Sequence, residues 1–206
     1  MRNVLRTIAV ILTVMVVLTG CTESDDPTGS GMSAVRVVLT DAATDYLSLA
    51  EVSISSVLLV PGDDDGTDAE DAPFLELLDP SEAPMTFNLL DLQNGVTAFL
   101  AEKAVPEGSY GQLRMIVEDA YVTLADGYTF EDGTTEADLK VPSGPQTGIK
   151  VKLDESLAAE EGLVTIVVVD FDADESFVIQ GDPESPDGIK SILFTPVLRE
   201  AARSVE

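Results

Sequence analysis

Histidine and tryptophan are absent from this chain of 206 residues, and cysteine occurs once. Without histidine, Ser-His-Asp catalysis, Cys-His catalysis and histidine-ligated zinc are excluded. A single cysteine excludes an internal disulfide and a cysteine cluster that could hold a metal. Basic residues are also scarce, since 11 Lys and Arg stand against 38 Asp and Glu, for a net charge of −27. Because nucleic-acid binding needs clustered positive charge, this balance argues against a nucleic-acid partner.

The first twenty residues have the features of a bacterial lipoprotein signal peptide. Arg2 and Arg6 precede an uncharged run over 7–18, which is shorter than the roughly 20 apolar residues of a spanning helix. The run ends in LTGC at 18–21, which resembles a lipobox and places the only cysteine where that motif needs its thiol. We therefore expect a signal peptide over 1–20 and a lipid on Cys21 that anchors the chain to a membrane. The alternatives are a secreted protein with an incidental cysteine and an uncleaved anchor.

A polar, acidic segment follows the cysteine and predicts a flexible linker over 21–33. Thr22 stands where the inner-membrane retention signal of enteric bacteria has Asp. The expected location is therefore the bacterial cell envelope, and the outer rather than the inner membrane where the cell has both.

The remainder predicts one all-β domain over 34–200, with a short C-terminal tail over 201–206. Short apolar or alternating runs rich in Val, Ile, Thr, Phe and Tyr are separated by Gly and Pro turns, as in an antiparallel β-sandwich. The expected strands are 34–40, 52–60, 74–78, 86–90, 112–119, 121–124, 128–130, 139–141, 149–153, 163–170, 177–180 and 192–198.

Two features of this pattern carry further expectations. The run over 163–169 is almost entirely apolar, which indicates a central strand covered on both faces. Helix is expected only over 96–104, ended by Pro106, and over 155–161, ended by Gly162.

Several short sequence phrases follow one another in a characteristic order and spacing. They are VRVVLTDA at 35–42, LLDL at 89–92, VPEGSY at 105–110, QLR at 112–114, VPSG at 141–144, GIK at 148–150, DFD at 170–172 and PVLR at 196–199. Together they resemble the bacterial domain of unknown function family DUF4382, found mostly in cell-envelope lipoproteins. Ala43 departs from the family pattern, which usually has Pro there. The resemblance implies an immunoglobulin-like or transthyretin-like β-sandwich and supplies no activity and no catalytic residues.

Tyrosine is the aromatic residue that could serve either the core or a binding surface. Tyr110 follows the turn at 106–108, so we expect its ring in the core and its hydroxyl on backbone. Tyr46 and Tyr128 are the tyrosines expected to be exposed.

The sharpest acidic constellation is DFDADE at 170–175. Alternate carboxylates of Asp170, Asp172 and Asp174 could present oxygen ligands to Ca²⁺. As an EF-hand the segment fails, because Glu175 stands where Gly is required. The alternative is an acidic turn whose Asp side chains bond nearby backbone N–H groups. A second acidic run, over 63–71, fits no named calcium loop and reads as an exposed loop.

No nucleophile, histidine or cofactor motif points to an enzyme. The expected function is a lipid-anchored, non-enzymatic binding or structural module that meets an envelope protein or a glycan, without a cofactor. The alternatives are a calcium-dependent binding or adhesion module and a hydrolase that uses carboxylates alone. The acidity itself fits either salt adaptation or attraction to cations.

Overall fold

A computed structural model of the chain describes residues 32–41, 45–62, 74–142 and 148–206. The expected lipidation site at Cys21 and the acidic run over 63–71 lie outside these ranges. The described residues are mostly strands, with one short α-helix, α1 (Ala173–Ser176), and one 3-10 turn, η1 (Leu89–Leu92).

The strands form three sheets. The four-stranded sheet has the order β13-β10-β1-β5, and a pair joins β11 to β12. In the seven-stranded sheet, β2 and β6 are central: β3 and β4 pair with β2, while β7, β8 and β9 pair with β6. Their bounds are β1 (Met32–Thr40), β2 (Leu47–Pro61), β3 (Leu75–Glu76), β4 (Met85–Asn88), β5 (Ala98–Pro106), β6 (Gly108–Leu124), β7 (Glu136–Leu139), β8 (Ile149–Val151), β9 (Leu157–Ala159), β10 (Val164–Phe171), β11 (Phe177–Gln180), β12 (Ser191–Phe194) and β13 (Leu198–Val205).

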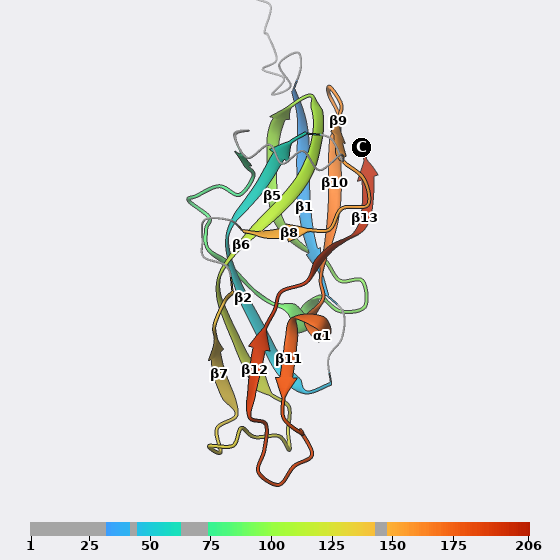
Figure 1. Cartoon of the computed structure of the whole chain (residues 1–206). Coiled ribbons are helices and arrows are strands. Elements are labelled where there is room, and N and C mark those ends of the chain that lie inside the picture. Colours follow the sequence, from blue (N-terminus) through green and yellow to red (C-terminus); the bar gives the residue numbers. More distant parts are fainter. Residues whose placement is uncertain (1–31, 42–44, 63–73, 143–147) are drawn as a thin grey trace, which may run out of the picture.

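The two long strands β2 and β6 run almost the whole length of the molecule (Figure 1). Beside their upper half lies the four-stranded sheet, and beside their lower half lie β11, β12 and α1 (Figure 1). One hydrophobic core cluster takes residues from all three sheets. The all-β sandwich predicted from the sequence is confirmed, and the β11–β12 pair adds a second, smaller layer at the lower end.

These sequences form half-buried strands because buried and partly exposed residues alternate along each strand. In β1, Val35, Val37 and Leu39 are fully buried, whereas Arg36 and Val38 between them are partly exposed. In β6, Leu113 and Met115 point into the core in the same way. Each strand therefore buries one face against the core, which is the main stabilising contribution of its apolar residues.

Tyr110 takes the core position expected from the sequence. It is 3% exposed, and its hydroxyl donates a hydrogen bond of 2.7 Å to the Pro106 carbonyl oxygen. Gly108, in the turn between these residues, has φ +151. The tyrosine thereby fixes the turn from β5 to β6 to the core beneath it.

Both expected helices are wrong. The segment 96–104 forms most of β5, which pairs antiparallel with β1 from Met32 to Leu39. Within 155–161, residues Leu157–Ala159 form β9, which pairs with β6. Residues such as Ala, Glu and Lys favour a helix locally, but a weak helix propensity yields to hydrogen bonding along an available sheet edge.

The expected tail over 201–206 is also wrong, because β13 continues through Val205 and pairs with β10. Val164 and Glu206 exchange two backbone hydrogen bonds of 3.0 Å. The strands therefore span Met32–Val205 rather than 34–200. The expected strand over 192–198 divides at Pro196, which cannot donate a ladder hydrogen bond, into β12 and β13.

Other strand boundaries shift by a few residues. The segments 112–119 and 121–124 merge in β6, and 139–141 gives way to the earlier β7. The segment 128–130 forms only a single bridge, Phe130 to Ile189. In 86–90 the strand ends at Asn88, whose side chain accepts from the Leu90 N–H and starts η1.

The apolar strand β10 is central, as expected, but only one of its faces is fully buried. Thr165, Val167 and Val169 point into the core, while Val164 and Ile166 are partly exposed. Its pairing with β1 is parallel, which departs from the purely antiparallel expectation. A parallel neighbour needs a long crossover, and the chain between β1 and β10 supplies it.

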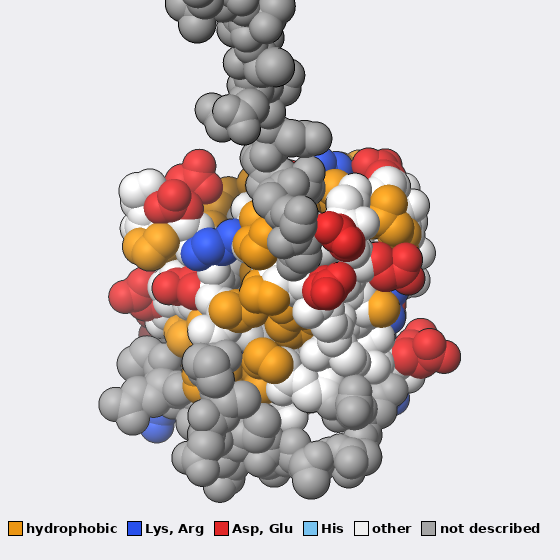
Figure 2. Space-filling model, turned by 90° about the horizontal axis from the view of Figure 1, so that it is seen from above, with side chains coloured by type: hydrophobic (Ala, Val, Ile, Leu, Met, Phe, Trp, Pro, Cys, Tyr) orange, Lys and Arg blue, Asp and Glu red, His pale blue; other side chains and the backbone are white. Residues whose placement is uncertain are grey.

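The excess of acidic residues is visible on the surface. On the upper end of the domain, Asp and Glu side chains stand around the periphery and hydrophobic side chains gather between them (Figure 2). The start of β1 and the C-terminus both lie at this end (Figure 1).

Candidate functional site

A cluster of carboxylates surrounds Arg199 where the lower end of the four-stranded sheet meets α1. Arg199 lies opposite Asp170 in the β10–β13 register, with its Nε 3.9 Å from the Asp170 Oδ2. Its Nη2 donates to the Asp172 Oδ2 at 2.5 Å and lies 3.0 Å from the Glu175 Oε2. One guanidinium therefore balances part of the charge of three carboxylates.

Asp172 also starts the short helix. Its Oδ1 accepts a hydrogen bond of 2.9 Å from the Glu175 N–H, which is the geometry of an N-cap. Because its other oxygen bonds Arg199, both oxygens of Asp172 are used within the protein. Asp172 thus joins α1 to β13.

Two further side chains hold α1 in place. The Ala173 N–H donates to the Asp41 Oδ1 at 2.9 Å, which connects the end of β1 to the helix. The Ser176 Oγ accepts from the Val197 N–H at 2.9 Å. The sequence phrases at 35–42, 170–172 and 196–199 therefore meet at this one place, which explains their occurrence together as structure.

Burial within this cluster raises the pKa of the Asp170 carboxyl, and the neighbouring Asp172 charge raises it further. Arg199 acts in the opposite direction on the same carboxyl, while Glu175 adds to the rise. The pKa of Arg199 is raised, first by its hydrogen bond to Glu175. The cation therefore stays protonated at any physiological pH.

The structure brings Asp170 and Asp172 together but leaves Asp174 apart from them. Asp174 is exposed and lines a neighbouring cleft, whereas the other two face Arg199. In the described part of the chain, no group of three or more Asp, Glu, His or Cys is arranged to hold a metal ion. Calcium binding by Asp170, Asp172 and Asp174 stays a prediction, and a cation there would have to compete with Arg199.

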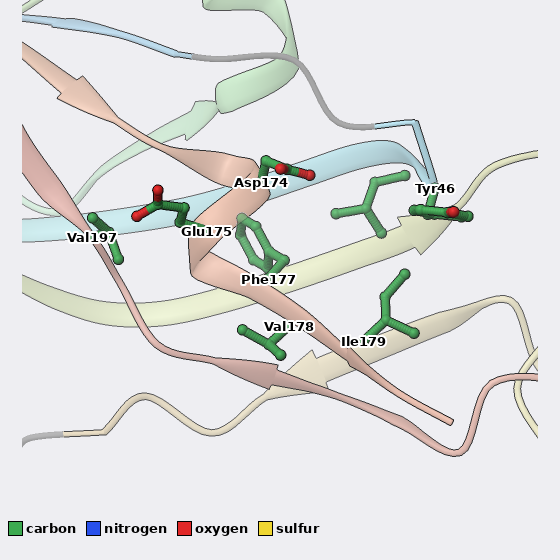
Figure 3. A pocket seen from close by; sticks show the side chains of 8 residues that line it. Tyr46, Asp174, Glu175, Phe177, Val178, Ile179 and Val197 are labelled. Atoms are coloured by element: carbon green, nitrogen blue, oxygen red, sulfur yellow. The ribbon is translucent and has the colours of Figure 1, made fainter. Parts of the chain in front are cut away.

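The cleft has a volume of about 420 Å³ and lies between α1, β11 and the start of β2. Its lining is mostly apolar, with a tyrosine and two carboxylates at the rim. The lining residues are Tyr46, Leu47, Asp174, Glu175, Phe177, Val178, Ile179 and Val197. Figure 3 shows Glu175 directed toward Val197 and Asp174 directed to the opposite side, toward Tyr46.

Tyr46 forms one wall of this cleft and is 37% exposed, as the sequence led us to expect. It meets Tyr128 edge-to-face, with ring centroids 5.4 Å apart and an interplanar angle of 73°. Tyr128 is more enclosed than expected, because it packs against the core as well. The contact between the two rings holds Tyr46 in position at the mouth of the cleft.

Sequence reasoning identified Asp174 and Tyr46 but missed the apolar lining residues. Phe177, Val178 and Val197 are ordinary strand or turn residues in the sequence, and only the pairing of β11 with β12 brings them beside β2. Nothing in the sequence marked Arg199 as functional; it stood out only as the last residue of the phrase PVLR at 196–199. Of this cluster, only the proximity of Asp170 and Asp172 could be predicted, because the two residues are two positions apart in the sequence.

Comparison with known proteins gives a family match. The model of a domain of unknown function, DUF4382, matches residues 32–193, which is more than half of the chain. No curated protein and no solved structure matches it. The match reaches from β1 into β12 and confirms the resemblance drawn from the sequence phrases.

Proposed function

The chain belongs to the DUF4382 family, and we propose that it is a lipid-anchored, non-enzymatic binding module of the bacterial cell envelope. Its cleft between α1, β11 and β2 binds a partner group that carries an aliphatic body and a positive charge. The aliphatic body packs on Phe177 and Val178, and the positive charge meets Asp174. The lipid anchor and the binding cleft are separate properties of the chain, and each has its own test.

The anchor is supported by the sequence around Cys21, with its basic start, short apolar run and LTGC ending. In the described ranges, the structure has no helix with the length and apolar character needed to cross a membrane. Two or more acyl chains give stable anchoring where one would not, since each buried CH₂ contributes about 0.8 kcal/mol.

The binding part rests on one observation: the two carboxylates at the cleft point apart. An acid–base pair for hydrolysis needs two carboxyl groups that converge on one bond of the substrate. Asp174 and Glu175 diverge from α1 (Figure 3), and Glu175 lies within 3.0 Å of Arg199. This divergence argues against carboxylate catalysis, and the exposed Asp174 beside an apolar lining favours a cation with an aliphatic body.

The anchor is tested by growing cells with labelled palmitate and comparing the wild-type chain with Cys21→Ser. The wild type should incorporate label and remain with the membrane fraction, and the variant should do neither. Incorporation that survives in Cys21→Ser would contradict lipidation at that residue.

The cleft is tested by an NMR titration of the full-length chain with hexylammonium chloride, with hexanoate as a probe of the opposite charge. Hexylammonium should shift amide resonances around Tyr46 and Val178, while hexanoate should not. Shifts dispersed over other acidic surfaces, with none at the cleft, would contradict the proposed site.

Val178→Ser, with Leu193→Ser as its control, tests the apolar wall. These residues face each other across β11 and β12 and are 40% and 52% exposed, but only Val178 lines the cleft. We expect weaker hexylammonium binding in Val178→Ser alone. An equal loss in both variants would mean that the shifts report a general effect on the β11–β12 pair.

A further inference from the structure

The cleft at α1 changes in polarity from its floor to its rim. Its most buried lining residues, Leu47 at the start of β2 and Phe177 at the start of β11, form the floor and are each 6% exposed. Ile179 and Val197 also line the cleft and are partly buried. None of these four side chains has a polar atom, so an ammonium group placed among them would lose hydration without gaining a partner.

The charged side chains of the cleft stand at its rim. Asp174 and Glu175 are both exposed and project from α1 in different directions (Figure 3). Glu175 lies 3.0 Å from the Arg199 Nη2, which balances its charge. In the ranges that the structure describes, no ion pair involves the Asp174 carboxylate. A ligand cation therefore meets unbalanced negative charge at Asp174 rather than at Glu175.

This change in polarity determines which end of a ligand enters the cleft first. An ammonium group at the rim meets Asp174 and keeps part of its hydration, while an aliphatic end on the floor leaves water. The reverse orientation would remove the ammonium group from water among Leu47 and Phe177. The favoured ligand therefore enters with its aliphatic end first and leaves its ammonium group at the rim.

Proteins offer two groups that combine an ammonium with an aliphatic body, and the two differ in this order. A lysine side chain is joined to its backbone through the aliphatic stem, so its ammonium group is the end that enters first. At a free N-terminus, the α-ammonium group and the first side chain leave the same Cα. An aliphatic first side chain can therefore reach the floor while the α-ammonium group stays at the rim.

We propose that the cleft at α1 captures the free N-terminus of a partner protein whose first residue is aliphatic. The α-ammonium group pairs with Asp174, and the first side chain packs on Leu47 and Phe177. The cleft volume of about 420 Å³ suits one or two residues rather than a long segment. This inference rests on the proposed function of the cleft and specifies the partner group.

Three small probes test the order of charge and aliphatic body. They are leucinamide, N-acetyl-leucinamide, which has no charge, and Nα-acetyl-lysinamide, which carries its charge on the side chain. Each is titrated into the full-length chain at about pH 6, where α-ammonium groups are protonated, and amide resonances around Tyr46 and Val178 are followed. Relative to leucinamide, N-acetyl-leucinamide should bind about two- to fivefold more weakly, and Nα-acetyl-lysinamide at least about tenfold more weakly.

The orientation of the bound probe is read from nuclear Overhauser contacts in the leucinamide complex. The methyl protons of leucinamide should contact the Phe177 ring and the Leu47 methyl groups. Contacts of the leucinamide Cα proton with these two residues, and none of its methyl protons, would overturn the orientation on which the proposal depends.

Asp174→Asn tests whether the α-ammonium group meets this carboxylate. The variant should weaken leucinamide binding and leave N-acetyl-leucinamide binding unchanged, so that the two probes bind equally. Glu184→Gln, which removes a charge from an exposed residue outside the cleft, should preserve their difference. A difference that survives in Asp174→Asn would contradict the proposed pairing.

The outcomes separate this inference from the proposed function. If hexylammonium binds at the cleft but leucinamide does not, or if Nα-acetyl-lysinamide binds as tightly as leucinamide, the N-terminal partner is overturned and the cation site stands. Equal binding of leucinamide and N-acetyl-leucinamide to the wild type would likewise overturn the proposal. If neither hexylammonium nor leucinamide shifts resonances at the cleft, the proposed function fails as well.

Discussion

At the scale of single residues, Arg199 and Asp172 organise the lower end of the four-stranded sheet. Arg199 meets three carboxylates, and Asp172 uses one oxygen for Arg199 and the other for the helix N-cap. A pair of this kind holds its elements in place more through directed hydrogen bonds than through net Coulomb attraction. The acidic phrase at 170–175 is therefore explained first as structure.

Replacing Asp172 by alanine should lower the free energy of unfolding by about 1–2 kcal/mol, because the N-cap bond and the contact with Arg199 are both lost. Asp174→Ala, on the same helix but exposed, should change it by less than about 0.5 kcal/mol. Urea denaturation of both variants measures the difference. Equal stability of the two would show that the cap contributes nothing.

Asp170 gives a prediction of pH dependence. Its pKa is raised by burial, so the folded protein holds this proton more tightly than the unfolded chain does. As pH rises from the unfolded pKa to the folded one, the folded state binds more protons than the unfolded state, and stability from this group falls. In the variant Asp170→Asn, which has no carboxyl group at this position, this decrease in stability with rising pH should be absent.

Urea titrations of wild type and Asp170→Asn, between about pH 4 and pH 7, measure this effect. The free energy of unfolding of the wild type, relative to the variant, should decrease as pH rises. A relative stability that increases with pH would mean that attraction to Arg199 outweighs the burial of Asp170 in the folded state.

At the scale of elements, pairing with distant strands decides the secondary structure of segments whose local sequence favours neither helix nor strand strongly. Strands β1, β6 and β10 were recognisable because their apolar alternation or density is an intrinsic property of each segment. Strands β5 and β9 were mistaken for helices because their neighbours in space, β1 and β6, are distant in the sequence. The cleft was unpredictable for the same reason, since Tyr46 and Phe177 are distant in the sequence and line one cleft only in the folded chain.

Two glycines with positive φ allow backbone strain to be compared with close packing, and one of them, Gly188, adjoins the Phe130 to Ile189 bridge. Gly188 has φ +88, and a Cβ there would lie 2.6 Å from the Thr129 carbonyl oxygen. Gly127 has φ +97, and a Cβ there would meet nothing within 4 Å. Gly127→Ala should cost about 1–2 kcal/mol through its backbone conformation alone.

Gly188→Ala should cost clearly more than Gly127→Ala, because the Phe130 to Ile189 bridge would also have to open. Thermal unfolding of the two variants, side by side, measures the difference. Equal melting temperatures would mean that the Phe130 to Ile189 bridge opens without measurable cost.

At the scale of the whole molecule, the dominant property is a net charge of −27. Carboxylates that the structure describes stand around the upper end of the domain (Figure 2) and also around Arg199, rather than at one site. Repulsion among them weakens the compact state and is screened by salt. A charge of this size fits either salt adaptation or specific cation binding.

Thermal melts in NaCl and in CaCl₂ at matched ionic strength distinguish the two. If screening dominates, both salts should raise the melting temperature equally. A site for Ca²⁺ would add a stabilisation that appears at low millimolar CaCl₂ and saturates. We expect the equal response, because Arg199 occupies the position between Asp170, Asp172 and Glu175.

Binding of a cationic group in the cleft at α1 is measured by the dissociation constant of hexylammonium for Asp174→Asn relative to wild type. The reference is Glu184→Gln, an equal loss of charge at a residue outside the cleft. We expect a dissociation constant raised about two- to fivefold in Asp174→Asn and unchanged in Glu184→Gln. Unchanged affinity in Asp174→Asn, or the same weakening in both variants, would contradict it.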